Sequence, residues 1–391
     1  MDKAKRAIPS LDGLRALSVL AVILGHSRSE WLDRIPFNAS FRNGGQGVGV
    51  FFVISGFLIT HLLLAELRRD GSIDLKRFYI RRTFRIFPPF YVFLFVIAVL
   101  ALFRLVQVNV HAMLAAATYT WNYAPLQPVW ILGHCWSLTL EEQFYLLWPA
   151  CITFFSRRTN LKIATLIIVL SPVSRVITYF VWPSMRFHMA MMLHTHLDTI
   201  MTGALLALAI DLKIWEKARR LALHPVAPAA ALVFLICVDT SAELRWRGMY
   251  LMTIGFSLEN VAIAVILLYA VFRHESFLGK FLNLAPVRHF GVISYGLYLW
   301  QQLFTGDRTI LFPLNILFIV ACAEMSYVLI ERPSFRLRDR VERWVTSRQV
   351  DSETRLSIAA DSIKVKAYPG IAGSVDRPLP SDTALQSPAC Q

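Results

Sequence analysis

The chain has 391 residues, of which 56% are hydrophobic and only 17% are charged, and its mean hydropathy is +0.51. These values exclude an average soluble domain, and the apolar residues form uninterrupted blocks that a helix with one wet face does not need. Lys and Arg outnumber Asp and Glu by 40 to 26, for a formal net charge of +14. Because this charge flanks hydrophobic segments, it is typical of membrane orientation, and nucleic acid is not an expected partner.

The hydrophobic blocks predict an all-α, polytopic integral membrane protein with about ten transmembrane helices. Crossing ~30 Å of hydrocarbon takes about 17–25 apolar residues. By this criterion the predicted spans are 11–28, 47–66, 86–106, 138–156, 161–182, 196–212, 225–240, 250–272, 286–304 and 309–331. The segment 108–124 is shorter and richer in Tyr, Trp and Asn, and we interpret it as interfacial or re-entrant.

Basic residues gather before the first span and in every second connection after it. These connections cover residues 68–85, 157–162, 213–220, 273–288 and 332–343. Cytoplasmic loops carry such an excess of Lys and Arg, so both termini are predicted to be cytoplasmic. The other connections also hold some arginines, so the charge map favours this orientation without fixing it.

Two domains are expected. Residues 1–335 form the transmembrane domain, and residues 336–391 are predicted to be a cytoplasmic, largely disordered tail rich in Ser, Asp, Pro and Gly. The five cysteines form no C-x-x-C pair, and the histidines show no metal-ligand spacing. We therefore expect no metal site and no permanently bound cofactor.

The first span carries ionisable residues on one face. Arg15 and His26 are eleven residues apart, which returns a helix to within ~20° of the same direction and separates them by roughly 16 Å along its axis. Asp12 lies on that face one turn before Arg15. Such groups usually face a polar interior and indicate function. The alternative, that Arg15 and His26 reach opposite membrane interfaces as ordinary polar ends, stays open.

The fourth span begins with two adjacent carboxylates, Glu141 and Glu142, shortly after Ser137. Acidic residues at a helix head interact favourably with its dipole, so they have a possible capping role, with Ser137 as the cap. Two acids are more than a cap needs, however, and Glu141 is placed to share a hydrogen bond with Tyr145 at i, i+4. The pattern favours a functional role for the carboxylates.

Arg82 and Arg85 end a basic segment just before Pro88 and Pro89. At i, i+3 their guanidinium groups form a fork suited to phosphate oxygens. As an alternative, the segment is a positive-inside anchor, which accounts for its charge alone.

In combination, these motifs resemble the acyltransferase-3 family of membrane-bound acyltransferases, which modify surface and secreted glycans. The resemblance runs in order over roughly residues 8–335. Its motifs are the segment Leu11–Ala16 with ten residues between Arg15 and His26, the segment Phe51–Ile59, Arg82-x-x-Arg85, the segment Trp136–Tyr145, the segment Ser294–Trp300 and Glu331-Arg332-Pro333. Many members have Asp where this chain has Gly49 and His where it has Gln301, so no family role is carried to Gln301.

The resemblance implies an O-acyltransferase of a cell membrane, most simply the bacterial inner membrane. It implies acyl-CoA, by default acetyl-CoA, as a cytoplasmic donor, and a glycan or glycolipid hydroxyl as the acceptor. It also implies that Arg15 and His26 are needed for activity and that Arg82 and Arg85 engage the CoA phosphates. We add Glu141 and Glu142 as candidates that orient His26 or bind the acceptor. His26 is expected to act as a general base or to carry the acyl group covalently.

A different class of protein fits the hydropathy equally well. A multi-helix transporter that exports a polar or lipid-linked substrate also needs many spans and polar residues within them. The arginine pair combined with Arg15 and His26 favours the enzyme, because a transporter has no evident need for it. A non-catalytic scaffold would leave Arg15 and His26 freely replaceable.

Overall fold

The computed structural model describes residues 8, 10–27, 44–124, 129–246, 248–306, 312–345 and 347, which contain helices and connections but no strand. The chain divides into two compact units, residues 1–336 and 337–391. Most of the predicted tail lies outside the described residues, and the account below concerns the first unit.

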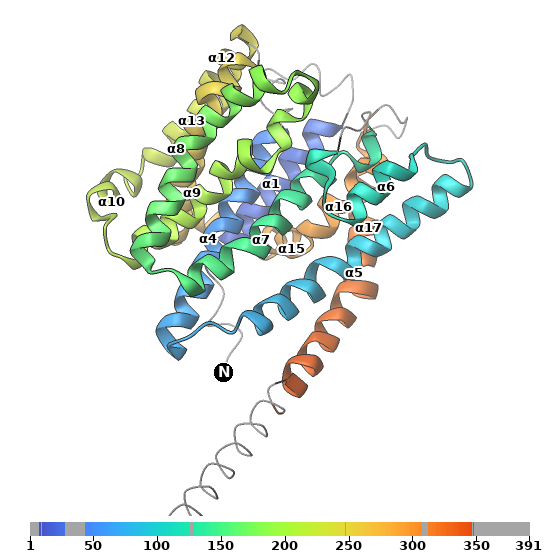
Figure 1. Ribbon diagram of the computed structural model, residues 1–391, viewed down its shortest axis with the longest axis horizontal. Helices are drawn as coiled ribbons and strands as arrows, with labels where there is room; N and C mark the ends of the chain where they lie inside the picture. Colours follow the sequence, from blue (N-terminus) through green and yellow to red (C-terminus); the bar gives the residue numbers. More distant parts are fainter. Residues whose placement is uncertain are drawn as a thin grey trace, which may run out of the picture. The chain divides into compact units, whose positions relative to one another are not determined.

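The described elements follow one another as helices joined mostly by short connections (Figure 1). In chain order they are α1 (Leu11–His26), α4 (Gly44–Asp70), α5 (Leu75–Leu102), α6 (Val110–Ala117), η2 (Trp121–Tyr123), η3 (Trp130–Leu132), α7 (Cys135–Phe154), α8 (Arg157–Val181), η4 (Pro183–Met191), α9 (Leu193–Asp211), α10 (Glu216–Ala222), α11 (Ala227–Val233), η5 (Phe234–Asp239), α12 (Thr240–Trp246), η6 (Leu251–Gly255), α13 (Phe256–Phe272), α14 (Phe277–Leu282), α15 (Ala285–Val292), α16 (Ser294–Phe304), α17 (Leu314–Ser326) and η7 (Tyr327–Glu331).

Every predicted span overlaps helix, but the helices differ in length. In the described part of the chain, seven are long and apolar enough to cross a bilayer: Gly44–Asp70, Leu75–Leu102, Arg157–Val181, His188–Asp211, Ala227–Trp246, Leu251–Phe272 and Leu314–Val345. The protein is therefore a multi-pass membrane protein. The predicted span 286–304 is two short helices, α15 and α16, which meet at Ile293. The predicted re-entrant segment 108–124 holds α6, whose eight residues are too few to cross.

The helix α5 extends further back than the sequence suggested. It begins at Leu75, where the Asp74 side chain accepts a hydrogen bond from the Arg77 backbone N–H, and it continues through Pro88 and Pro89. The basic segment before the prolines is thus helical, so Arg82 and Arg85 occupy successive turns of one helix and project from the same side.

The helix α4 packs against α1 and α9, and α9 packs against α8 (Figure 1). Two glycines allow the crossing of α4 and α9. A Cβ on Gly56 would overlap the carbonyl oxygen of Ile200, and a Cβ on Gly203 would overlap that of Val53. Small residues at such crossings let two backbones approach closely, which is how helices associate in membranes.

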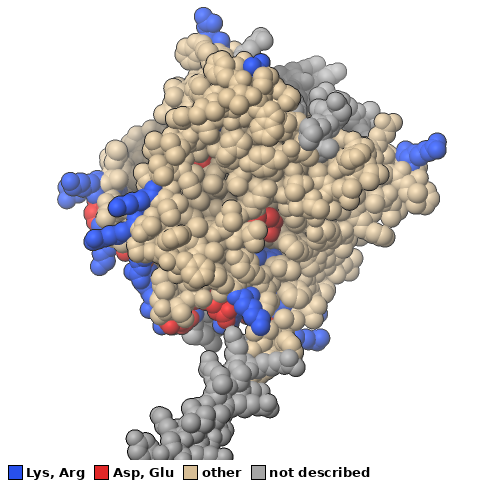
Figure 2. Space-filling view, in the orientation of Figure 1, with Lys and Arg blue, Asp and Glu red and all other residues tan. Residues whose placement is uncertain are grey.

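Large apolar side chains point outward from the bundle. Phe95 on α5, Leu147 on α7 and Phe180 on α8 are 67%, 57% and 71% exposed. In Figure 2, most of the visible surface carries neither sign of charge, and Lys and Arg gather mainly toward its margins. An exposed apolar surface of this extent is what lipid requires and what water disfavours.

Candidate active site

Five of the six predicted site residues line one cavity. Its volume is about 90 Å³, and its walls come from α1, α4, α5, α7 and α16. The predicted residues in these walls are Arg15, Arg82, Arg85, Glu141 and Glu142. Predicted site residues as far apart in the chain as Arg15 and Glu142 therefore meet at one polar site.

Arg15 lies on the inward side of α1. Its guanidinium donates a hydrogen bond to the Asp12 carboxylate over 3.4 Å, and its side chain is 18% exposed against 34% for Asp12. The predicted stripe of Asp12 and Arg15 is thus a real ion pair one turn apart. Asp12 does not line the cavity, so Arg15 is the member of the pair that a ligand there would meet.

Arg82 is held by aromatic rings. Its guanidinium carbon lies 4.8 Å from the centroid of Tyr145 and 5.7 Å from that of Phe78. Cations over aromatic faces are attracted to the ring quadrupole, which fixes the guanidinium without using all of its N–H donors. Arg82 also interacts electrostatically with Glu141 and Glu142. Arg85, one turn further along α5, is more exposed.

The carboxylates are not a helix cap. The helix α7 begins at Cys135, and its first turn contains no acidic residue, so Glu141 and Glu142 lie in the second turn. The predicted cap Ser137 lies inside the helix, where its hydroxyl donates to the His134 carbonyl oxygen. A purely capping role for these carboxylates is therefore excluded, and their position on the cavity wall leaves them facing the arginines.

His26 does not line this cavity. It is the last residue of α1, eleven positions from Arg15, and at 1.5 Å per residue the two lie roughly 16 Å apart along the helix axis. Its Nδ1 is 3.0 Å from Oε1 of Gln301, and its ring meets the edge of Trp130 with 5.2 Å between centroids. The hydrogen-bond partner of His26 is therefore a glutamine on α16, not Glu141 or Glu142.

The bond to Gln301 defines the tautomer of His26. With the Gln301 amide oriented as in the structure, its oxygen accepts the hydrogen bond from Nδ1, so in the neutral ring Nε2 is the nitrogen with the lone pair. The Thr305 hydroxyl donates to the same oxygen over 3.3 Å and to the Gln301 carbonyl over 3.0 Å, which steadies the amide. The Gln301 side chain is fully buried.

A second histidine repeats this arrangement next to the first. The backbone N–H and Nδ1 of His134 lie 2.8 and 2.6 Å from Oε1 of Gln302. The ring of His134 packs edge-on against Phe93 and Tyr298. The His134 side chain is nearly fully buried, and its Nε2 has no hydrogen-bond partner among the described residues.

Three further cavity residues were not singled out from the sequence. Ser55, Tyr295 and Tyr298 all line it. Ser55 shares a hydrogen bond with the Tyr145 hydroxyl, and the Tyr295 hydroxyl donates to the Ile86 carbonyl over 3.0 Å. They belong to the family-like segments at 51–59 and 294–300, so the signal for them was present, but hydroxyl residues in apolar helices are common and carry no spacing rule.

Among the described residues, no three His, Cys, Asp or Glu side chains gather as ligands for a metal ion. The polar groups at the cavity are those that bind oxyanions and carbonyl groups, namely guanidinium and hydroxyl donors, with carboxylates beside them.

The fold and site together define a multi-pass helical membrane protein with an arginine-lined cavity near one end of α1 and a tautomer-fixed histidine at the other. The acyltransferase-domain family matches residues 8–329, and the chain belongs to this family. The resemblance inferred from the motifs is confirmed. None of the solved structures matches the chain.

Three relatives illustrate the likeness. The chain is 30% identical to the peptidoglycan O-acetyltransferase OatA of Listeria monocytogenes, over 76% of this chain and 49% of the relative. It is 32% identical to the O-acetyltransferase OatA of Staphylococcus aureus, over 84% of this chain and 57% of the relative. It is 30% identical to the putative peptidoglycan O-acetyltransferase YrhL of Bacillus subtilis, over 95% and 64%. The chain thus spans about half to two thirds of the length of these relatives.

Proposed function

We propose that this chain is a membrane-bound O-acyltransferase that moves an acyl group, most simply acetyl, from cytoplasmic acyl-CoA to a hydroxyl of a cell-surface or lipid-linked glycan. The names of its relatives favour a glycan of the peptidoglycan type. One observation carries the proposal: three arginines meet at a cavity near one end of α1, and a histidine whose Nδ1 bonds to Gln301 lies at the other end.

In this proposal the membrane separates donor from acceptor. The chain crosses about ten times with both termini in the cytoplasm, so Arg82 and Arg85 face the cytoplasm and His26 lies near the outer surface. The alternation of basic connections supports this topology. An enzyme that worked on one side only would not need its charged site and its histidine at opposite ends of a helix.

The donor binds at the arginine end. Arg82 and Arg85 engage the phosphates of CoA, and Arg15 binds a donor phosphate or carbonyl oxygen further in. Glu141 and Glu142 balance this positive charge and orient the guanidinium groups, which replaces their suggested role at His26.

The acceptor reacts at the histidine end. Nε2 of His26 takes the proton of the sugar hydroxyl as that oxygen attacks the acyl carbonyl; the C–S bond of the thioester then breaks, and CoA leaves as its thiol with the proton from Nε2. Alternatively, Nε2 first accepts the acyl group from the thioester and passes it to the sugar. Both routes need Nε2 to be unprotonated, and the hydrogen bond from Nδ1 to Gln301 supports this state. Gln301 is a positioning residue in either route.

The test uses purified protein in liposomes supplied with acetyl-CoA and a soluble glycan acceptor. A general base contributes about 10²–10⁴-fold, so His26→Ala should lower transfer by that factor. The matched control is His111→Ala, because His111 on α6 is exposed and remote from the cavity. Wild-type rates in the folded His26 variant would overturn the proposal. A transporter, which the relatives do not favour, would consume no acetyl-CoA at all.

A further inference from the structure

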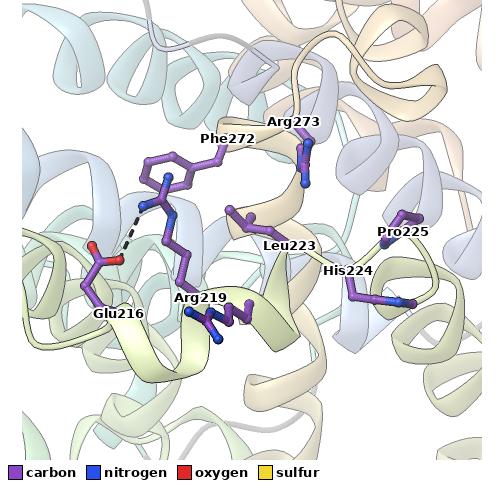
Figure 3. Close-up of a pocket in the computed structure, with 8 residues that line it drawn as sticks. Glu216, Arg219, Leu223, His224, Pro225, Phe272 and Arg273 are labelled. Carbon is purple, nitrogen blue, oxygen red and sulfur yellow. Dashed lines mark hydrogen bonds and ion pairs between the residues drawn. The ribbon is translucent and has the colours of Figure 1, made fainter.

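A second cavity among the described residues lies away from the site. It has a volume of about 690 Å³ and is formed by two connections, the one between α9 and α11 and the one that follows α13. Figure 3 shows Glu216, Arg219 and His224 of the first connection on one side and Phe272 and Arg273 on the other. Three of the candidate membrane spans end or begin at these connections, so the cavity lies at a membrane surface.

The cavity is strongly basic. Arg219, Arg220 and Arg273 line it together with His224, against a single carboxylate, Glu216. Glu216 is already paired with Arg219 at 3.3 Å. Neither Arg220 nor Arg273 has an acidic partner in the parts of the chain that the structure describes, and both side chains are exposed. Orientation requires only that positive charge lie on one side of the membrane, not that it converge on a cavity.

Phe272, which lines the cavity, is 38% exposed, and further exposed apolar side chains lie outside the lining but close to it in the chain. Leu221 and Val226 of the first connection are 77% and 61% exposed, and Phe277, just after the second, is 90% exposed. The guanidinium of Arg219 lies 5.7 Å from the centroid of Trp215, which packs against Phe272. An inorganic anion needs only the cations, whereas a lipid also needs apolar contacts for its glycerol and acyl chains.

We propose that this cavity binds the phosphate headgroup of an anionic phospholipid. Arg220 and Arg273 contact the phosphate oxygens, and the exposed apolar side chains contact the acyl chains. The site is separate from the cavity at Arg15 and makes no use of the acyl-transfer chemistry. Its function is to anchor the connections that follow α9 and α13 to the charged surface of the membrane.

The experiment measures the melting temperature of the purified full-length protein with added phosphatidylglycerol, phosphatidylcholine or inorganic phosphate. Phosphatidylglycerol should raise the melting temperature, and the other two should not. Each surface cation contributes about fivefold to binding of an anionic membrane, so the double variant Arg220→Ala, Arg273→Ala should bind phosphatidylglycerol about 30-fold more weakly by titration. The matched control removes the same charge elsewhere, as Arg158→Ala with Lys162→Ala.

Three outcomes would overturn the proposal. An equal loss in the control variant would mean that net charge alone attracts the lipid. An equal stabilisation by inorganic phosphate would mean that the cavity is a simple anion site. If the double variant does not fold, the comparison of the two phospholipids on the wild-type protein still decides, because a lack of preference for phosphatidylglycerol contradicts the inference. No readout involves acyl transfer, so this test is independent of the proposed function.

Discussion

Gln301 provides the sharpest test of the proposed chemistry, because it forms a hydrogen bond with His26 and does not line the donor cavity. Gln301→Met removes the hydrogen-bond acceptor of Nδ1 while keeping a side chain of similar length. The tautomer with a free Nε2 then loses the support of one hydrogen bond, worth about 0.5–1.5 kcal/mol net. If that amount is lost in the transition state, kcat should fall roughly 2- to 13-fold, with the donor KM unchanged.

The chain offers a matched control one residue away. Gln302 is a buried glutamine on the same helix as Gln301. Its side chain forms a hydrogen bond with His134, a histidine outside the proposed chemistry. Gln302→Met should lower the melting temperature, because it removes the bonds to the backbone N–H and ring of His134, but it should leave kcat near the wild-type value. Gln301→Glu keeps an acceptor oxygen and should therefore have a higher kcat than Gln301→Met.

The assay is the initial rate of acetyl transfer in liposomes over a range of acetyl-CoA concentrations, with the melting temperature recorded for each variant. The reasoning is refuted if Gln301→Met retains the wild-type kcat. It is also refuted if Gln302→Met loses as much kcat at an equal loss of stability, since both effects would then be structural.

Three other predictions concern donor binding, acyl specificity and the core. Replacing Arg82 and Arg85 together by Ala should raise the KM for acetyl-CoA at least about tenfold, because each arginine contributes one charge-assisted hydrogen bond to a phosphate. Lys76→Ala, which removes an exposed charge on the same helix, should leave the KM unchanged. An unchanged KM in the double variant would contradict phosphate binding. Octanoyl-CoA should be transferred far more slowly than acetyl-CoA if the proposed acetyl specificity, which rests on the names of the relatives, is right, and equal rates would contradict it. In the wild-type protein the fully buried Asp198 carboxylate lies 3.0 Å from the Arg175 guanidinium. Arg175→Met leaves this carboxylate without its cation and should destabilise the fold by about 3–5 kcal/mol, measured as a lower melting temperature.

Arg175 and Asp198 also show where inspection of the sequence falls short. Both lie in predicted spans and both are completely buried, and Arg175 additionally donates to the carbonyls of Thr195 and Met252. The sequence shows two ionisable residues 23 positions apart. Nothing in helical periodicity indicates that α8 and α9 fold back on each other and bring these groups together.

The amino-acid sequence by itself determined the class of protein. Long apolar blocks have only one stable outcome in lipid, because every backbone N–H and C=O must be satisfied within its own helix. That local requirement predicts the helices and their approximate bounds. The eleven-residue spacing of Arg15 and His26 placed them far apart along one helix for the same reason, since the rise per residue is constant.

Only the tertiary structure decided which residues share a site. Arg82, Glu141 and Tyr298 line one cavity from three helices, and Gln301 contacts His26 although it lies 275 residues later in the chain. Such contacts depend on how helices cross, and the crossing depends on small residues such as Gly56 and Gly203, whose effect is visible only when the facing backbone is known. Spacing along a helix is a property of one segment, whereas a site between helices is a property of their packing.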